Sequence, residues 1–213
     1  MDSELTRAWL LNAALLVERE KDRLTQLDLA IGDGDHGVNM QRGFSAVAAT
    51  LAEPPAGDVT AGQLLVSAGT TLVSTVGGAS GPLFGSSFRA LGKALEAAGE
   101  ADDDGRALAD GLIAARDSIQ RMGAAQPGDK TMYDVYEVAT EAFGRAVRSG
   151  AGPKASARAA AEAAEEGVRA TESMQARRGR ASYLGLRSVG HQDPGAASAA
   201  LIFRALATAM EAK

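Results

Sequence analysis

Apolar residues recur every three or four positions along most of the chain, which is the spacing of one buried face on an α-helix. The pattern starts with Leu5, Trp9 and Leu16 and is clear again over residues 40–51, 108–122 and 132–143. We find no convincing run in which apolar and polar residues alternate, as they would along a half-buried strand. The pattern therefore predicts an all-α protein of about eight amphipathic helices.

Capping signals place several of the helix ends. Thr60 and Gln63 form a candidate capping box before an apolar stripe over residues 65–76. Pro82 is suited to the first turn of another helix, and Asp193 and Pro194 to the N-cap and first turn of the last one. Residues 153–174 are rich in alanine and glutamate and predict a further helix.

The length of the chain and its connections indicate one domain. A chain of 213 residues is long enough to bury a sizeable core. Residues 53–58 and the acidic residues 100–104 are expected to form short surface turns between helices. There is no internal repeat and no long linker, so a single domain over residues 1–213 is expected.

Composition and charge exclude several classes of function. The net charge is -5, and without a basic stripe a nucleic-acid partner is not expected. The chain has no cysteine, which removes disulfides, thiol catalysis and thiolate metal sites. No apolar run approaches the ~20 residues of a membrane span. The first residues lack the basic and apolar regions of a secretory signal, so a cytoplasmic location is expected.

Four connections are unusual in composition. Glycine, proline and polar residues concentrate over residues 28–39, 77–81, 123–132 and 177–195, next to helix starts. In an up-and-down helical bundle, alternate connections emerge at the same end. The four segments are therefore expected to form a composite site at one end of the molecule.

The first of these segments carries three carboxylates, Asp28, Asp33 and Asp35, within eight residues. Clustered carboxylates repel one another unless a cation or several donors lie among them. Mg²⁺ prefers oxygen ligands, and the intervening glycines let the backbone fold around such a centre. The alternative is a surface turn whose aspartates cap a helix starting near Val38. The residues alone leave both interpretations open.

The other three segments have candidate roles toward a phosphate-bearing ligand. The glycines of 77–81 precede a helix, whose N-terminus attracts phosphate, although a plain connection has the same appearance. Met132 either packs in the core or lies against a nucleobase. The arginines of 177–195 suit phosphate oxygens. Both histidines of the chain, His36 and His191, lie in these segments.

Together the four segments carry a resemblance to a known family. The stretches "IGDGDHGVNMQRGF", "VGGASGPLFG", "PGDKTM" and "GRASYLG…GHQDPGA" occur in the order and spacing of the nucleotide-binding L subunits of bacterial dihydroxyacetone kinase. The chain resembles this family almost end to end. The combination of four matching segments is specific, whereas "GDGD" alone would not be.

The resemblance implies a fold, a cofactor and site residues. The family fold is a barrel of eight antiparallel helices with ADP or ATP and two Mg²⁺ at one end. Asp28, Asp33 and Asp35 would hold the two Mg²⁺ ions, and no catalytic nucleophile is expected on this chain. The residues implied in nucleotide binding are His36, Gly37, Val38, Asn39, Ala79, Ser80, Gly123, Met132, Arg180, Asp193, Pro194 and Gly195.

The resemblance also implies partners. In this family dihydroxyacetone sits on a separate K subunit, and an M protein of the phosphotransferase system recharges the bound ADP to ATP. The short, unfused chain and the "GHQDPGA" segment favour this subclass. The alternatives are a kinase subunit that uses free ATP, a kinase domain for another acceptor such as a carrier-bound fatty acid, and a nucleotide-sensing module that docks on a regulator.

Overall fold

The fold is made of helices alone throughout the part of the chain that the structure, a computed structural model, describes: residues 1–52, 57–99 and 104–212. This confirms the all-α prediction. Eight α-helices and two 3-10 segments follow one another along these residues. They are α1 (Ser3–Ile31), α2 (His36–Ala52), α3 (Ala61–Thr75), α4 (Ser80–Ala98), α5 (Arg106–Gly123), α6 (Met132–Arg148), α7 (Pro153–Ala170), η1 (Thr171–Ser173), η2 (Arg180–Ser188) and α8 (Pro194–Glu211).

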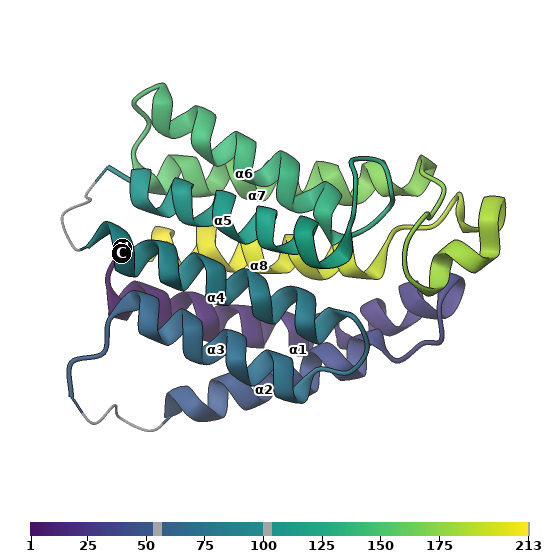
Figure 1. The fold of residues 1–213 in the computed structure, drawn as a ribbon, viewed down its shortest axis with the longest axis horizontal. Helices are drawn as coiled ribbons and strands as arrows, with labels where there is room; N and C mark the ends of the chain where they lie inside the picture. The colour runs from purple at the N-terminus through teal and green to yellow at the C-terminus, as the bar shows by residue number, and fades with distance from the viewer. Residues whose placement is uncertain (53–56, 100–103, 213) are drawn as a thin grey trace.

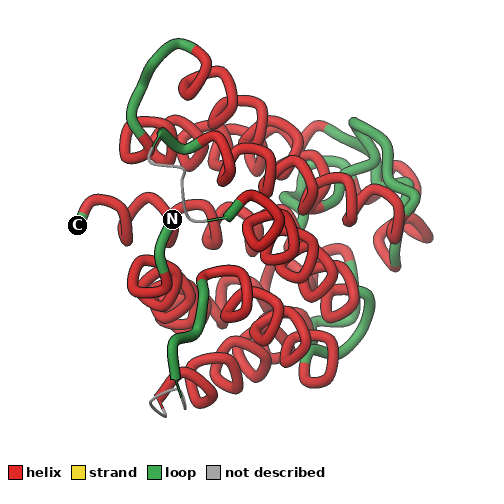
Figure 2. Tube along the Cα trace, turned by 60° about the vertical axis from the view of Figure 1, so that its left-hand side comes forward, coloured by secondary structure: helices red, strands yellow, loops and turns green. Residues whose placement is uncertain are grey.

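The helices run alternately in opposite directions and close into a ring (Figure 1). Each α-helix packs on the next one along the chain, and α8 closes the ring by packing on both α7 and α1. The tube view shows the same closed bundle of long helices with loops gathered at its ends (Figure 2). Because each helix packs on at least two others, each needs an apolar face, which explains the regular three-and-four spacing.

The predicted helix ends are largely correct. Thr60 forms the expected capping box with Gln63, and the Asp193 side chain caps α8 by accepting from the backbone N–H of Ala196 at 2.7 Å. α4 begins two residues before Pro82, and α7 ends at Ala170 and continues as a 3-10 turn. The 3-10 segment η2 was not predicted, because its residues have no helical periodicity.

Aromatic residues fill the centre of the ring. Trp9 of α1 lies 5.7 Å from Phe88 of α4, measured between ring centroids, and Phe44 of α2 lies 6.3 Å from Phe88. The indole N–H of Trp9 donates to the carbonyl of Ile202 in α8 at 2.9 Å, so this buried polar atom is satisfied. Met122, expected on the apolar stripe of α5, is instead 54% exposed, because α5 ends one residue later at the surface.

Helices α3 and α4 approach one another so closely that their backbones touch at glycines. A Cβ added to Gly69 would lie 2.5 Å from the carbonyl oxygen of Gly85, and one added to Gly92 would lie 2.5 Å from that of Gly62. Gly62 and Gly69 are seven residues apart in α3, and Gly85 and Gly92 are seven residues apart in α4. The two glycines of each helix therefore lie on one face of it. The glycines let two helices pack with almost no side-chain layer between them.

The four unusual connections all emerge at one end of the ring, at the right of Figure 1. We call this end the site rim; it comprises residues 28–39, 77–81, 123–132 and 171–195. The turns expected at 53–58 and 100–104 fall largely on residues 53–56 and 100–103, which lie outside the described residues. In the described ranges, no helix combines the length and the apolar character needed to cross a membrane.

Candidate functional site

Four helices begin at the site rim. Because the helices alternate in direction, α2, α4, α6 and α8 all have their N-termini there (Figure 1). A helix N-terminus presents unpaired backbone N–H groups and a partial positive charge of about half an elementary charge. Four such ends at one rim make it attractive to an anion, although the net charge of the chain is negative.

The three predicted carboxylates lie together at the rim. Ligand oxygens of Asp28, Asp33 and Asp35 are all within 4.8 Å of one another; Asp28 is buried and the other two are exposed. One oxygen of Asp28 accepts from the backbone N–H of Asp35 at 2.9 Å and of His36 at 3.1 Å. Asp28 therefore caps the start of α2, as the interpretation of this segment as a capping turn required. The closeness of the three carboxylates also suits a cation, as the alternative interpretation required.

Several details of the cluster fit a divalent cation. Its donors are carboxylate oxygens, which Mg²⁺ prefers. Gly32 leaves space for the Asp28 carboxylate, since a Cβ there would lie 2.1 Å from Asp28 Oδ1. The Arg180 guanidinium pairs with Asp33 at 3.1 Å, but both side chains are exposed, so this pair is weak and can separate. The cluster carries three negative charges and one nearby positive charge.

His36 connects three of the helix N-termini. Its ring hydrogen-bonds through Nε2 to the Ser198 hydroxyl of α8 at 2.8 Å and through Nδ1 to the Ser80 hydroxyl of α4 at 3.2 Å. Burial lowers the pKa of His36, although the negative charges of Asp28 and Asp35 oppose this shift. His36 thus holds the first turns of α2, α4 and α8 beside the carboxylates.

The rest of the predicted segment 36–39 packs tightly on its neighbours. A Cβ on Gly37 would lie 2.1 Å from the carbonyl oxygen of Lys21, so only glycine lets α2 cross α1 here. Asn39 lies against Gly77 and accepts from Arg42 at 2.8 Å; Arg42 also donates to the carbonyl of Thr75. Val38, in contrast, is exposed.

The N-terminus of α4 differs from the other three. Ala79 stands at its N-cap position, and α4 has no side-chain cap from any described residue. The starts of α2, α6 and α8 are capped by Asp28, Thr131 and Asp193 respectively. The amides of α4 are therefore the ones left for a ligand. Gly123, predicted for this site, lies against Leu83 in the first turn of α4.

The start of α6 meets the start of α8. The Met132 side chain is buried and lies under Gly195, where a Cβ would be 3.6 Å from the Met132 methyl carbon. Pro194 and Gly195 are buried as well. Burial raises the pKa of Asp193 to about 7, against the opposing effect of its Ala196 N–H bond and the positive charge of Lys130.

A buried lysine that the sequence did not single out joins two of the rim segments. Lys130 is 1% exposed and donates to the carbonyls of Thr171 and His191. Its φ of 61° is unusual for a residue with a side chain. Burial lowers its pKa, while Asp193 and Glu172 oppose the shift. No local sequence signal marks a lysine whose partners lie more than forty residues away.

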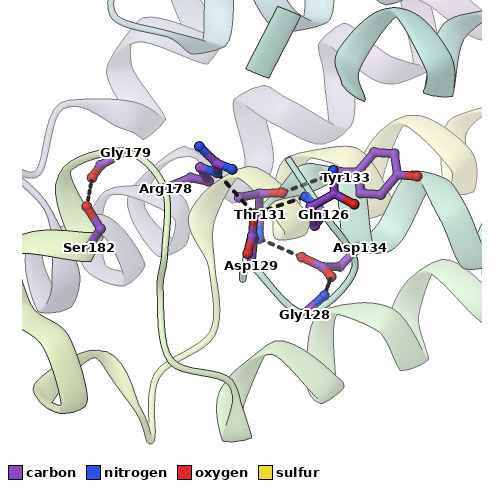
Figure 3. Close-up of polar contacts among 9 residues, drawn as sticks. All are labelled: Gln126, Gly128, Asp129, Thr131, Tyr133, Asp134, Arg178, Gly179 and Ser182. Atoms are coloured by element: carbon purple, nitrogen blue, oxygen red, sulfur yellow. Dashed lines mark hydrogen bonds and ion pairs between the residues drawn. The ribbon is translucent and has the colours of Figure 1, made fainter. Parts of the chain in front are cut away.

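Two further aspartates, which were not predicted as site residues, stabilise the 123–132 segment (Figure 3). Asp134 closes the start of α6 by accepting from the backbone N–H groups of Gly128 at 2.5 Å and Thr131 at 2.8 Å. Asp129 accepts from Arg178 at 3.0 Å, and its backbone carbonyl accepts from the Arg177 N–H. The Thr131–Asp134 spacing is a capping box and could have been found from sequence.

Every predicted site residue therefore lies at the site rim, and contacts connect the four segments. His36 joins 28–39 to 77–81 and to α8, while Arg180 reaches back to Asp33. Lys130 and Asp129 join 123–132 to 171–195. The rim is a single, continuous assembly of carboxylates, helix N-termini and arginines; helix N-termini and arginines suit phosphate oxygens, and carboxylates suit a cation.

Comparison with known proteins identifies the family. The model of the DAK2 domain matches residues 30–208, and the chain belongs to this family. The "PEP-dependent dihydroxyacetone kinase, ADP-binding subunit DhaL" of Escherichia coli K12 is 42% identical over 94% of both chains. The ADP-binding subunit DhaL of PEP-dependent dihydroxyacetone kinase 1 from Listeria innocua is 38% identical over 96% of both chains. The resemblance drawn from the four motifs is confirmed.

Larger relatives contain a comparable region. The D-erythrulose kinase of Mycolicibacterium smegmatis is 38% identical over 95% of this chain, which spans 34% of that enzyme. The native dihydroxyacetone kinase of C. freundii has the same fold, with a TM-score of 0.71 and 22% identity over 96% of this chain and 34% of that one. Its complex with AMP-PNP and Mg²⁺ gives 0.70 and 25% over 96% and 33%.

Proposed function

We propose that this chain is the ADP-binding subunit of a phosphoenolpyruvate-dependent dihydroxyacetone kinase. It holds ADP or ATP with two Mg²⁺ at the site rim, in the cytoplasm. It receives a phosphoryl group from an M protein and passes it to dihydroxyacetone held on a separate K subunit. The relatives that match over their whole length, from Escherichia coli and Listeria innocua, carry this role in their names.

One observation carries the proposal: three carboxylates within 4.8 Å of one another stand beside the uncapped N-terminus of α4. His36 holds the two together through its bond to Ser80. A nucleoside diphosphate with Mg²⁺ needs both free backbone N–H groups and carboxylates, since N–H groups suit phosphate oxygens and carboxylates suit the cation. The related C. freundii kinase was crystallised with AMP-PNP and Mg²⁺.

The chain's residues have separate roles in this proposal. Asp28, Asp33 and Asp35 hold the Mg²⁺ ions, which neutralise phosphate charge. The backbone N–H groups of residues 77–80 donate to the phosphates. Arg180 leaves its exposed ion pair with Asp33 and contacts the nucleotide instead. Met132 and Gly195 form a buried apolar floor suited to a flat base. The remaining nucleotide contacts are His36, Gly37, Val38, Asn39, Ala79, Gly123, Asp193 and Pro194.

The surface beside the site supports docking on a partner. Tyr183 is 87% exposed and Leu186 76% exposed, and both belong to η2 at the site rim. Large apolar side chains this exposed are characteristic of interaction surfaces. We assign this surface to the K subunit, because the acceptor must reach the nucleotide and no group on this chain is proposed to bind it.

A nucleotide held by four segments and two cations should leave slowly, because many contacts must break together. It would then remain bound while phosphoryl groups pass through. The chain is loaded with radiolabelled ADP and mixed with the K subunit, the M protein, the upstream phosphotransferase proteins, dihydroxyacetone and excess unlabelled ADP. The label is expected to stay on the protein through many turnovers.

Three results would contradict the proposal. Loss of one labelled nucleotide per product molecule would identify a kinase that uses free ATP. Robust phosphorylation by the isolated chain with ATP and dihydroxyacetone would contradict the division between subunits. Failure of the K subunit to support transfer, together with capture of a fatty-acid carrier or a transcriptional regulator, would assign the site to another acceptor or to sensing.

A further inference from the structure

A polar cavity lies between α1, α7 and α8, and one residue of the site rim, Gln192, also lines it. Its volume is about 320 Å³, and three arginines, Arg23, Arg169 and Arg204, line it together with Glu165 and Gln192. The cavity is within the size range of small-molecule sites. The three lining arginines outnumber the single lining carboxylate by two charges. None of these residues takes part in the proposed nucleotide site.

The arginines of this cavity are incompletely paired. Arg204 is partly buried, and its Nε is enclosed without a hydrogen-bond partner. Leaving such a donor without a partner is unfavourable, so a ligand oxygen that accepted a hydrogen bond from the Arg204 side chain would be stabilised. Arg169 has neither an ion pair nor a side-chain hydrogen bond with any residue in the described ranges. Only Arg23 is engaged, by Glu20 at 3.2 Å and Gln192 at 3.1 Å.

The floor of the cavity is apolar. Val168 of α7 and Leu201 of α8 line it, together with the small residues Ala197 and Ala200. The small side chains of α8 leave the space, and the arginines of three helices surround it. A ligand that fills both parts has a short carbon body and a compact anionic group.

We infer that this cavity binds a small phosphate monoester. The planar fork of an arginine makes paired hydrogen bonds to phosphate oxygens, and a monoester carries close to two negative charges near neutral pH. Such a dianion is attracted by Arg169 and Arg204, the two lining arginines that have no ion pair with any described residue, whereas Arg23 is paired with Glu20. The inference rests on cavity residues that are not among the proposed nucleotide contacts, so it is independent of the proposed nucleotide function.

The test titrates the protein with glycerol 3-phosphate as a probe of this class, in chelator so that no cation supports anion binding at the site rim. Calorimetry gives the affinity, and backbone amide shifts in nitrogen-15 NMR spectra give the location. Saturable binding with shifts at Ala197, Ala200 and Leu201 is expected. Glycerol, which lacks the anionic group, should not bind.

Variants assign the binding to the arginines. Arg204→Gln and Arg169→Gln should each weaken the probe by about tenfold or more, which corresponds to about 1.4 kcal/mol. Arg158→Gln is the matched control, because Arg158 lies on α7 and pairs with Glu211 away from the cavity. Arg169 is exposed, so its variant is expected to fold even if the Arg204 variant does not.

Specific outcomes would overturn the inference. These are equal affinity in all three variants, amide shifts confined to residues 28–39 and 77–81, and absence of saturation. Equal binding of succinate, a dianion without phosphate, would overturn the assignment to phosphate monoesters.

Discussion

Asp28 and Asp35 have different structural roles although both belong to the carboxylate cluster. Asp28 is buried and accepts two backbone N–H groups, so it is needed for the turn into α2. The Asp35 carboxylate is exposed, and its backbone rather than its side chain takes part in that turn. Substitution of Asp35 therefore separates cation binding from folding, which substitution of Asp28 does not.

The Asp35→Asn variant should lose affinity for ADP in the presence of Mg²⁺ by about tenfold or more, because a ligand charge is removed. The helical circular dichroism should not change. Calorimetry measures the ADP affinity of the variant and of the parent protein, each with Mg²⁺ and with a chelator. The Asp22→Asn variant, on the exposed face of α1, makes the same charge change and should bind as the parent does. ADP affinity that is equal with and without Mg²⁺ would refute the cation site.

The buried carboxyl of Asp193 should make stability depend on pH. Its pKa is about 7 in the folded protein against an ordinary value of 3.8, so the folded state holds an extra proton between these pH values. The free energy of unfolding should therefore fall as pH rises from about 4 to about 7, by at most about 1.4 kcal/mol per unit, and level off above.

Urea unfolding across this pH range, without Mg²⁺ or nucleotide, measures the slope. Asp193→Asn keeps an oxygen that can accept from the Ala196 N–H but cannot ionise, so its slope should be smaller than the parent's over the same range. Identical pH profiles for the two proteins would show that Asp193 titrates normally. In the variant, Asp134 and Glu137, whose pKa values are also raised by burial, still contribute a falling slope, while His36, whose pKa is lowered by burial, contributes a rising one.

At the scale of helices, the contact between α3 and α4 depends on the absence of side chains. Gly85→Ala would place a Cβ 2.6 Å from the carbonyl oxygen of Gly69 and 2.4 Å from a methyl of Val73. Backbone cannot give way as a flexible side chain can, so the helices must separate. We expect a loss of about 1–3 kcal/mol in the free energy of unfolding.

Gly144→Ala in α6 is the matched control. There a Cβ would meet only the far end of the Arg148 side chain, at 3.1 Å, which can move. Because alanine favours a helix interior, this variant should be neutral or more stable by about 0.5–1 kcal/mol. Chemical denaturation of both variants compares them. Equal changes in the free energy of unfolding for the two variants would mean that the close contact between α3 and α4 does not require glycine at position 85.

At the scale of the whole molecule, ADP binding and partner docking should be separable. The Leu186→Glu variant places a charge on the exposed apolar surface of η2. It should bind ADP with Mg²⁺ normally but lose most phosphoryl transfer when the K subunit is supplied. The exposed side chain packs on little, so the stability should not change.

Leu15→Glu is the control for this prediction, because Leu15 is 48% exposed in the first half of α1, away from the site rim. It should support transfer as the parent does. Equal transfer rates for both variants would place the docking surface elsewhere, whereas a loss of ADP binding in Leu186→Glu would place Leu186 in the nucleotide site.

The amino-acid sequence by itself determined the features that depend on neighbours within a few residues. Helical periodicity, the Thr60–Gln63 capping box and the Asp193 cap are interactions over three or four positions, so they could be predicted. The four motifs were also local, and their order was sufficient for the family resemblance. The candidate carboxylates lie within eight residues, and their proximity followed from that spacing.

Tertiary structure alone decided the contacts made across the ring. Lys130 meets Thr171 and His191, and His36 meets Ser80 and Ser198, over separations of 41 to 162 residues. Such pairs arise only when alternating helices bring distant segments to one end. Closure of the ring also left the arginine-lined cavity beside α8, because the space between three helices depends on how all of them pack.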